Sequence, residues 1–232
     1  GPDQKPYPFD LYSMRQAIDE GFILDVLQNY TTYGAYYQLE KTIEDDPELR
    51  GRRGQARVAR YASLHPTAID QKVEVIVEHF RVHVQKQLSG RAKAMVVAQS
   101  REHALRYWQR INAYIEEKQY SDLKALVAFS GDLNIDGTEW TEASANGFAK
   151  TELPKKFDTD EFHILVVAEK YQTGFDQPRL VAMYVDKNMF GLQAVQTLSR
   201  LNRSHPGKKE TFVLDFRNTT EEVKEAFKPF YE

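Results

Sequence analysis

The sequence predicts an α/β fold in which a parallel sheet is flanked by helices. Short, continuous apolar runs alternate with helix-type segments from about residue 92 onward, a pattern typical of parallel strands that are buried on both faces. The 232 residues suffice for one large domain, or for a domain with an appendage. We therefore expect a mostly helical N-terminal extension or linker over residues 1–90 and the sheet domain over residues 91–232.

The first forty residues predict a helix followed by a strand. Residues 11–30 read as a helix, because apolar side chains recur at helical spacing. These are Met14, Ile18, Phe22, Val26 and Tyr30. Alternating apolar positions from Tyr33 to Leu39 then predict a half-buried strand.

Two charged clusters and a second helix complete this extension. Acidic residues over 44–48 precede arginines spread over 50–60. We interpret the arginine cluster as a solvated loop balanced by the acids; a DNA-backbone or interdomain surface is the alternative. Thr67 and Asp70 form a capping-box pattern. It would open a helix whose apolar face holds Ile69, Val73, Ile76, Val77, Phe80 and Val84.

The remaining chain predicts five strands and two main helices. The strands are residues 94–98, 126–129, 164–168, 180–185 and 212–215. Ser100 can cap a helix, because a serine oxygen accepts a bond from a free backbone N–H of the first turn. The apolar face of that helix comprises Ala104, Trp108, Ile111 and Ile115. A second helix is expected from about Gly191 to Asn202, and a polar stretch, residues 130–154, interrupts the alternation.

Composition narrows the class of protein. The chain has no cysteine, which excludes disulfides and thiolate metal sites and fits a cytoplasmic protein. No apolar run approaches the roughly 20 residues that span a bilayer, so we expect no membrane partner. The net charge is −3, so any nucleic-acid contact would be a local patch. The chain starts with Gly1 and Pro2, which resembles a cloning scar, and we expect a fragment of a longer polypeptide.

The segment Q-T-L-S-R-L-N-R, residues 196–203, carries the strongest chemical signal. On a helix, residues three and four apart share a face. Gln196, Arg200 and Arg203 could therefore project together. A planar amide and two guanidiniums suit a phosphate chain, because arginine binds oxyanions through paired donors and stays charged. The alternative interpretation is structural: such an arginine pair can simply be a solvated or ion-paired surface.

A second signal is the loop T-G-F-D-Q-P, residues 173–178, which follows the strand ending at Ala168. We expect it at the carboxyl edge of the sheet, where ligand sites collect. Gly174 permits close backbone approach to a phosphate, and Asp176 can accept hydrogen bonds from a sugar hydroxyl or an arginine. The bland alternative for Asp176 is a turn residue.

These segments, together with V-V-A-Q-S-R at 96–101, resemble motifs IV, V and VI of superfamily two helicases and translocases, in the same order. The run from Ile164 to Pro178, the segment M-Y-V-D-K at 183–187 and residues 21–33 further resemble the motor (R) subunit of type I restriction enzymes. The resemblance covers residues 8–217 and is weakest over 130–160. It implies a RecA-like fold, the second of two in that motor.

The resemblance also implies roles for individual residues. Arg203 would be the arginine finger that reaches the γ-phosphate of ATP across an interdomain cleft, with Arg200 beside it. The nucleotide would also contact Gln196, Gly174 and Asp176. Three residues would contact DNA: Thr173, Ser100 and Arg101. No metal ligand is expected in this chain; His79 and His83 have metal-like spacing, but no third ligand is suggested.

No G-x-x-x-x-G-K-[ST] phosphate loop occurs in the sequence. The resemblance therefore implies that ATP and Mg²⁺ bind only in the intact two-lobe motor and that this fragment alone is not an ATPase. The implied partners are double-stranded DNA, the first RecA-like domain and the nuclease domain of the parent chain, and the methylation and specificity subunits. The alternatives are the C-terminal lobe of another superfamily two translocase, or a non-catalytic module that docks DNA or a partner.

Overall fold

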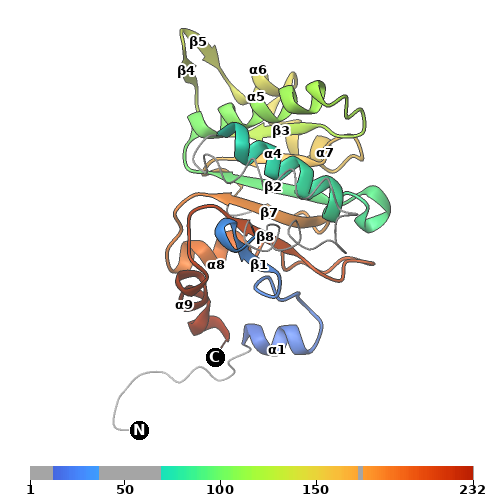
Figure 1. Ribbon diagram of the computed structural model, residues 1–232, viewed down its shortest axis with the longest axis vertical. Helices are drawn as coiled ribbons and strands as arrows, with labels where there is room; N and C mark the ends of the chain where they lie inside the picture. Colours follow the sequence, from blue (N-terminus) through green and yellow to red (C-terminus); the bar gives the residue numbers. More distant parts are fainter. Residues whose placement is uncertain (1–12, 37–68, 172–174, 232) are drawn as a thin grey trace, which may run out of the picture.

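A six-stranded parallel sheet forms the centre of the molecule (Figure 1). The computed structural model describes residues 13–36, 69–171 and 175–231. The strand order is β1–β8–β7–β2–β6–β3, and every pair is parallel. The strands are β1 (Tyr30–Thr32), β2 (Lys93–Ala98), β3 (Ala125–Ala128), β6 (Ile164–Val167), β7 (Leu180–Asp186) and β8 (Phe212–Asp215). The five strands predicted after residue 90 are confirmed to within one or two residues.

One face of the sheet is covered by α4 (Ile69–His79), its π-helical continuation η2 (Phe80–Val84) and α5 (Arg101–Glu117) (Figure 1). The predicted apolar face of the first helix is confirmed, because Val73, Ile76, Val77, Phe80 and Val84 are fully buried. The predicted cap of α5 is also confirmed: the Ser100 side chain accepts a hydrogen bond from the His103 N–H. A short 3-10 turn, η3 (Gln87–Gly90), leads from η2 into β2.

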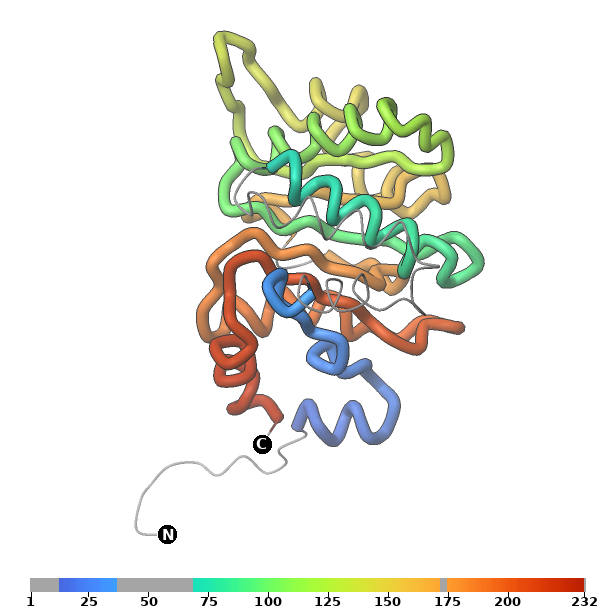
Figure 2. The backbone as a smooth tube through the Cα atoms, in the orientation of Figure 1, coloured from blue at the N-terminus to red at the C-terminus, as the bar shows by residue number. Residues whose placement is uncertain are grey.

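The opposite face is covered by α7 (Leu153–Phe157), α8 (Leu192–Leu198) and α9 (Thr220–Tyr231). Phe157, Leu198 and Phe227 are fully buried against the sheet. The short helix α1 (Met14–Asp19) lies beside α9, so the two ends of the described chain come together (Figure 2). None of the described helices is long and apolar enough to cross a membrane.

The prediction of one helix over residues 11–30 is wrong. Helix α1 ends at Asp19, and Gly21 follows with a φ of 76°, a left-handed conformation that ends a helix. The strand predicted from Tyr33 is also misplaced, because β1 is Tyr30–Thr32 and residues 33–36 are helical. Parallel pairing of β1 with β8, in which Tyr30 lies opposite Val213 far along the chain, overrides the local pattern.

The described part of the first ninety residues shares the sheet and core with the rest of the chain. Strand β1 extends the sheet beside β8, and α4 packs on α5 and shares one buried core with β2 and β7. The acidic cluster 44–48, the arginine cluster 50–60 and Thr67 lie outside the described residues. The division of the chain at residue 90 stays a prediction.

The polar stretch after β3 forms a hairpin and short helices. Strands β4 (Leu133–Ile135) and β5 (Thr138–Trp140) are antiparallel and project beyond the sheet (Figure 1). Asp136 and Gly137 have positive φ at the turn, as a tight two-residue hairpin requires. Helix α6 (Glu142–Asn146) and the 3-10 turn η4 (Lys150–Glu152) lead into α7.

Candidate functional site

The arginines of the 196–203 segment do not lie on one helix with Gln196. Helix α8 ends at Leu198, so Gln196 lies exposed in its last turn; Arg200 follows in a turn and Arg203 in an extended conformation. The chain here pairs with a distant segment: Leu24 N donates to Asn202 O at 2.9 Å, and Ile23 forms a β-bridge with Arg203. This tertiary pairing replaces the last helical turn that local spacing predicted.

The two arginines nevertheless lie beside the loop that precedes β7. Arg203 Nε is 3.5 Å from Asp176 Oδ1, and Arg200 Nη1 donates to the Phe175 carbonyl at 3.0 Å. The side chains of Arg203 and Asp176 are 52% and 70% exposed. Burial lowers the pKa of Arg200, and the positive charge of Arg203 contributes. The structure thus brings three predicted site residues together; Thr173 and Gly174 lie outside the described residues.

A buried lysine holds both segments in place. Lys208 Nζ donates to the carbonyl oxygens of Leu201 at 2.7 Å, Arg203 at 2.9 Å and Pro178 at 3.2 Å. Burial lowers the pKa of Lys208 to about 7. Since the three carbonyls come from both sides of the Arg203–Asp176 pair, Lys208 fixes their spacing. No sequence pattern indicates this role, because the three acceptors are backbone carbonyls, which every residue carries.

Asp176 lies near the amino edge of the sheet, so its predicted place at the carboxyl edge is wrong. The next residue, Gln177, donates from Nε2 to Asp158 Oδ1 at 3.1 Å, and Arg179 donates to Asp160 Oδ1 at 2.7 Å. Both aspartates precede β6. From Phe175, which is buried in the core of this face, the described part of the loop leads to the start of β7.

Ser100 and Arg101 lie at the opposite, carboxyl edge, directly after β2. The Ser100 hydroxyl lies 2.8 Å from His103 Nδ1 as well as capping α5. Arg101 Nη1 donates to the Ser130 carbonyl at 2.8 Å, in the loop after β3. The predicted residues thus form two groups, one at each edge of the sheet, rather than one cluster.

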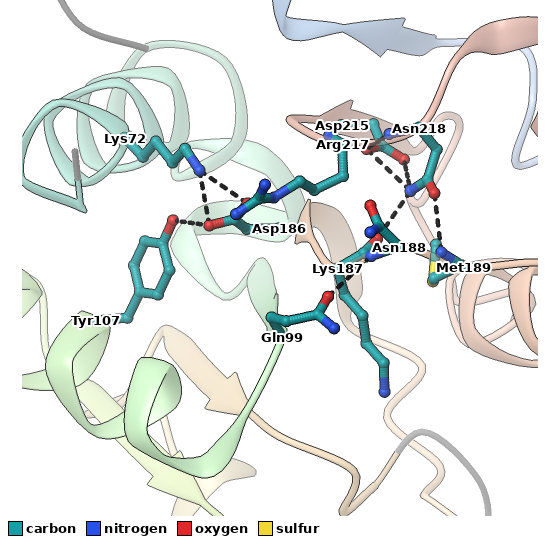
Figure 3. Close-up of polar contacts among 10 residues, drawn as sticks. All are labelled: Lys72, Gln99, Tyr107, Asp186, Lys187, Asn188, Met189, Asp215, Arg217 and Asn218. Atoms are coloured by element: carbon teal, nitrogen blue, oxygen red, sulfur yellow. Dashed lines mark hydrogen bonds and ion pairs between the residues drawn. The ribbon is translucent and has the colours of Figure 1, made fainter. Parts of the chain in front are cut away.

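A buried ionic network that the sequence did not reveal also occupies the carboxyl edge (Figure 3). Asp186, the last residue of β7, accepts two bonds of 2.8 Å from Lys72 Nζ, one of 2.6 Å from the Tyr107 hydroxyl and one of 2.7 Å from Arg217 Nε. Burial alone would raise the pKa of Asp186, but these bonds and the charge of Lys72 lower it. Its partners come from three distant segments, so no local spacing marks them.

A second carboxylate lies next to this network. Asp215, the last residue of β8, accepts bonds of 2.8 Å from the backbone N–H groups of Arg217 and Asn218 and from the Tyr30 hydroxyl. Burial raises the pKa of Asp215, against the effect of these bonds. The two aspartates hold the chain after β8 in a fixed turn. Among the described residues, no group of three or more metal-type ligands occurs.

The geometry defines a class of protein. A parallel sheet with helices on both faces, and an arginine pair packed on the loop before the neighbouring strand, form a RecA-like α/β domain of the helicase type. The fragment structure of a provisionally assigned HsdR subunit of a type I restriction enzyme from Vibrio vulnificus YJ016 shares this fold. Its TM-score is 0.54 at 15% identity, covering 97% of this chain and 37% of that one. The ATP-dependent type ISP restriction-modification enzyme LlaBIII bound to DNA has the same TM-score, 0.54, at 14% identity, covering 95% of this chain and 15% of that one.

The sequence comparisons agree with the fold. Residues 137–218 match the family described as type I restriction enzyme subunit R domain 3. The provisionally named MjaVIIP type I restriction enzyme endonuclease subunit of Methanocaldococcus jannaschii is 27% identical over 66% of this chain and 15% of its own length. The HindI endonuclease subunit of Haemophilus influenzae is 22% identical over 93% of this chain and 21% of its own length.

Fold and sequence comparisons together support the predicted resemblance of this chain to the HsdR-type (R) subunits of type I restriction enzymes. The chain spans about 15% of the length of the first of these relatives and 21% of the HindI subunit. The predicted family and the predicted RecA-like fold are therefore confirmed. The roles assigned to single residues stay predictions.

Proposed function

We propose that this chain is the second motor domain of an ATP-dependent DNA translocase within a type I restriction enzyme. The observation that carries the proposal is the placement of Arg203 and Arg200 on Asp176 and Phe175. The exposed guanidinium of Arg203, beside the half-buried Arg200 on a carboxylate-bearing loop, is suited to bind the phosphates of a nucleotide presented by another surface. The match of residues 137–218 to the R-subunit family supports this assignment.

In this proposal ATP and Mg²⁺ bind mainly to the first RecA-like domain of the parent chain, since this sequence has no phosphate loop. Arg203 then supplies positive charge to the γ-phosphate when the two lobes close. Phosphoryl transfer depends on such charge stabilisation, and a finger is worth roughly 10³–10⁵ in rate. Arg200, Gln196, Gly174 and Asp176 contact the same nucleotide. The isolated chain is not an ATPase.

Ser100 and Arg101, at the carboxyl edge, form part of the track for double-stranded DNA, and Thr173 contacts the same DNA. Alternate closing on ATP and opening after hydrolysis then moves the duplex past the complex. The parent chain adds a nuclease domain, and separate methylation and specificity subunits anchor the complex on DNA. The two groups of site residues at opposite edges support this division of labour between nucleotide and DNA.

Small-angle scattering of the intact two-lobe subunit tests whether this domain works as a motor lobe. Addition of a non-hydrolysable ATP analogue should reduce the radius of gyration in the wild type and not in Arg203→Ala. An unchanged radius in the wild type would identify the domain as a docking module for DNA or a partner subunit.

A further inference from the structure

The side chain of Arg217 is held rigidly at the carboxyl edge of the sheet. Its Nε donates to Asp186 at 2.7 Å, and its backbone N–H donates to Asp215 at 2.8 Å (Figure 3). Among the described residues, its two terminal nitrogens have no hydrogen-bond partner, and 40% of the side chain is exposed. The outer half of the guanidinium is therefore oriented in advance and open to a ligand.

Asp186 does not need Arg217 for its own neutralisation. Lys72 already donates to both of its oxygens, with side-chain exposures of 4% and 3%, and the Tyr107 hydroxyl adds a third bond. A buried carboxylate with one buried ammonium is balanced in charge. Arg217 is therefore a second cation on Asp186, and because the neighbouring carboxylate of Asp215 is bonded to the backbone of Arg217, the outer edge of the guanidinium stays available to an anion outside the chain.

The neighbouring strand end presents another oriented donor. Gln99, one residue beyond β2, accepts a 3.1 Å bond from Asn188 N through its Oε1, which fixes its amide group. Among the described residues its Nε2 has no partner, and the residue is exposed. Strands β2 and β8 flank β7, so the two strand ends that carry these donors lie roughly 10 Å apart along the edge.

We propose that Arg217 binds a backbone phosphate of double-stranded DNA, with Gln99 donating to the same strand. Paired guanidinium nitrogens match two phosphate oxygens, and an anchored fork loses less conformational entropy on binding than a free one. Carboxyl edges of parallel sheets are the usual place for ligands. This proposal rests on the proposed function, because it extends the DNA track from Ser100 and Arg101 across β7 to β8.

Equilibrium binding of the 232-residue chain to a fluorescent duplex of about 20 base pairs tests the proposal, across salt concentrations from about 20 to 150 mM and without ATP. Arg217→Gln should weaken binding roughly tenfold at low salt and flatten the slope of log affinity against log salt by about one. Arg217→Lys, which keeps the charge, should retain the slope. Gln99→Ala should weaken binding with the slope unchanged.

Arg81→Gln is the matched control, because Arg81 pairs with Asp122 at the amino edge and its loss changes the net charge equally. Identical affinity and slope for wild type and Arg217→Gln, or no wild-type binding at the lowest salt, would overturn the proposal. Arg217→Gln leaves Lys72 and Tyr107 on Asp186, and thermal unfolding checks its fold.

Nuclear magnetic resonance of the wild type provides a second measurement that needs no variant. The Arg217 Nε–H signal should move on addition of the duplex, and not with equimolar ATP or inorganic phosphate. A shift with ATP and none with DNA would make this a nucleotide site and contradict the proposal. Failure here leaves the finger role of Arg203 untouched, since that role is read from ATP turnover.

Discussion

Arg203 and Asp176 form an ion pair of 3.5 Å between the segment after α8 and the loop before β7. The pair therefore links the arginine segment, residues 196–203, to the loop before β7, residues 173–178, which are the two segments with the strongest sequence signals. Both side chains are more than half exposed, so the pair adds little to stability. The pair instead orients the exposed guanidinium of Arg203, on the side of the sheet that carries α8.

Replacement of Asp176 should separate ATP use from DNA movement. Asp176→Asn removes the charge beside Arg203, and because the pair is exposed, the free energy of unfolding should change by less than about 1 kcal/mol. In the intact enzyme we expect the translocation rate to fall severalfold further than ATP turnover, because Asp176 contacts the nucleotide but also links it to the DNA track. Translocation and phosphate release are measured together, with Asp19→Asn on α1 as an exposed control. A normal translocation rate would remove Asp176 from the mechanism.

Buried Lys208 should position Arg203 through its hydrogen bond to the Arg203 carbonyl. Lys208→Met keeps the apolar stem but leaves the carbonyls of Leu201, Arg203 and Pro178 without their shared donor. Loss of bonds to buried acceptors costs about 1–3 kcal/mol of unfolding free energy. ATP turnover of the intact subunit should fall further than stability explains at a temperature where the variant is fully folded. The control is Lys209→Met, because Lys209 is the exposed neighbour of Lys208. Equal ATP turnover in the Lys208→Met and Lys209→Met variants would refute the positioning role.

His79 should make the fold sensitive to acid. Burial, with the nearby charge of His83, lowers its pKa to about 3, and its Nδ1 lies 2.9 Å from the Tyr184 hydroxyl. Between pH 6.5 and about 3 the unfolded chain binds a proton that the folded chain does not. The unfolding free energy should therefore fall with falling pH, by roughly 1.4 kcal/mol per pH unit from this residue.

Chemical denaturation at several pH values measures this effect. His79→Gln should show a shallower loss of stability between pH 6 and pH 4 than the wild type, whereas His205→Gln on the surface loop should match the wild type. Parallel curves for all three proteins would show that His79 does not carry the acid response.

Local pattern predicted the central sheet well. The apolar runs of β2, β3, β6, β7 and β8 are continuous, and each strand is buried on both faces. The Ser100 cap and the apolar face of α4 were also correct, because caps and helical faces depend on neighbours within a few residues. The prediction failed where distant chain segments decide the conformation.

Three such cases concern the site itself. Arg203 leaves the helix because its backbone pairs with Ile23. Asp176 lies near the amino edge because Gln177 and the residues after it bond to the aspartates before β6. Lys72 is a polar position on α4 with no marked neighbour in the sequence, because its partner Asp186 is 114 positions away. Such contacts form between segments that are far apart in the chain, so the spacing of residues along the sequence cannot predict them.

DNA-stimulated ATP turnover of the intact subunit carrying Arg203→Ala tests the central claim most directly. Arg203 is predicted to supply charge only to the transition state, so turnover should fall by roughly 10³ or more. DNA affinity should stay within about twofold of wild type, and the exposed Arg106→Ala should behave as wild type. Turnover within a few fold of wild type, or equal losses in turnover and DNA affinity, would contradict the account.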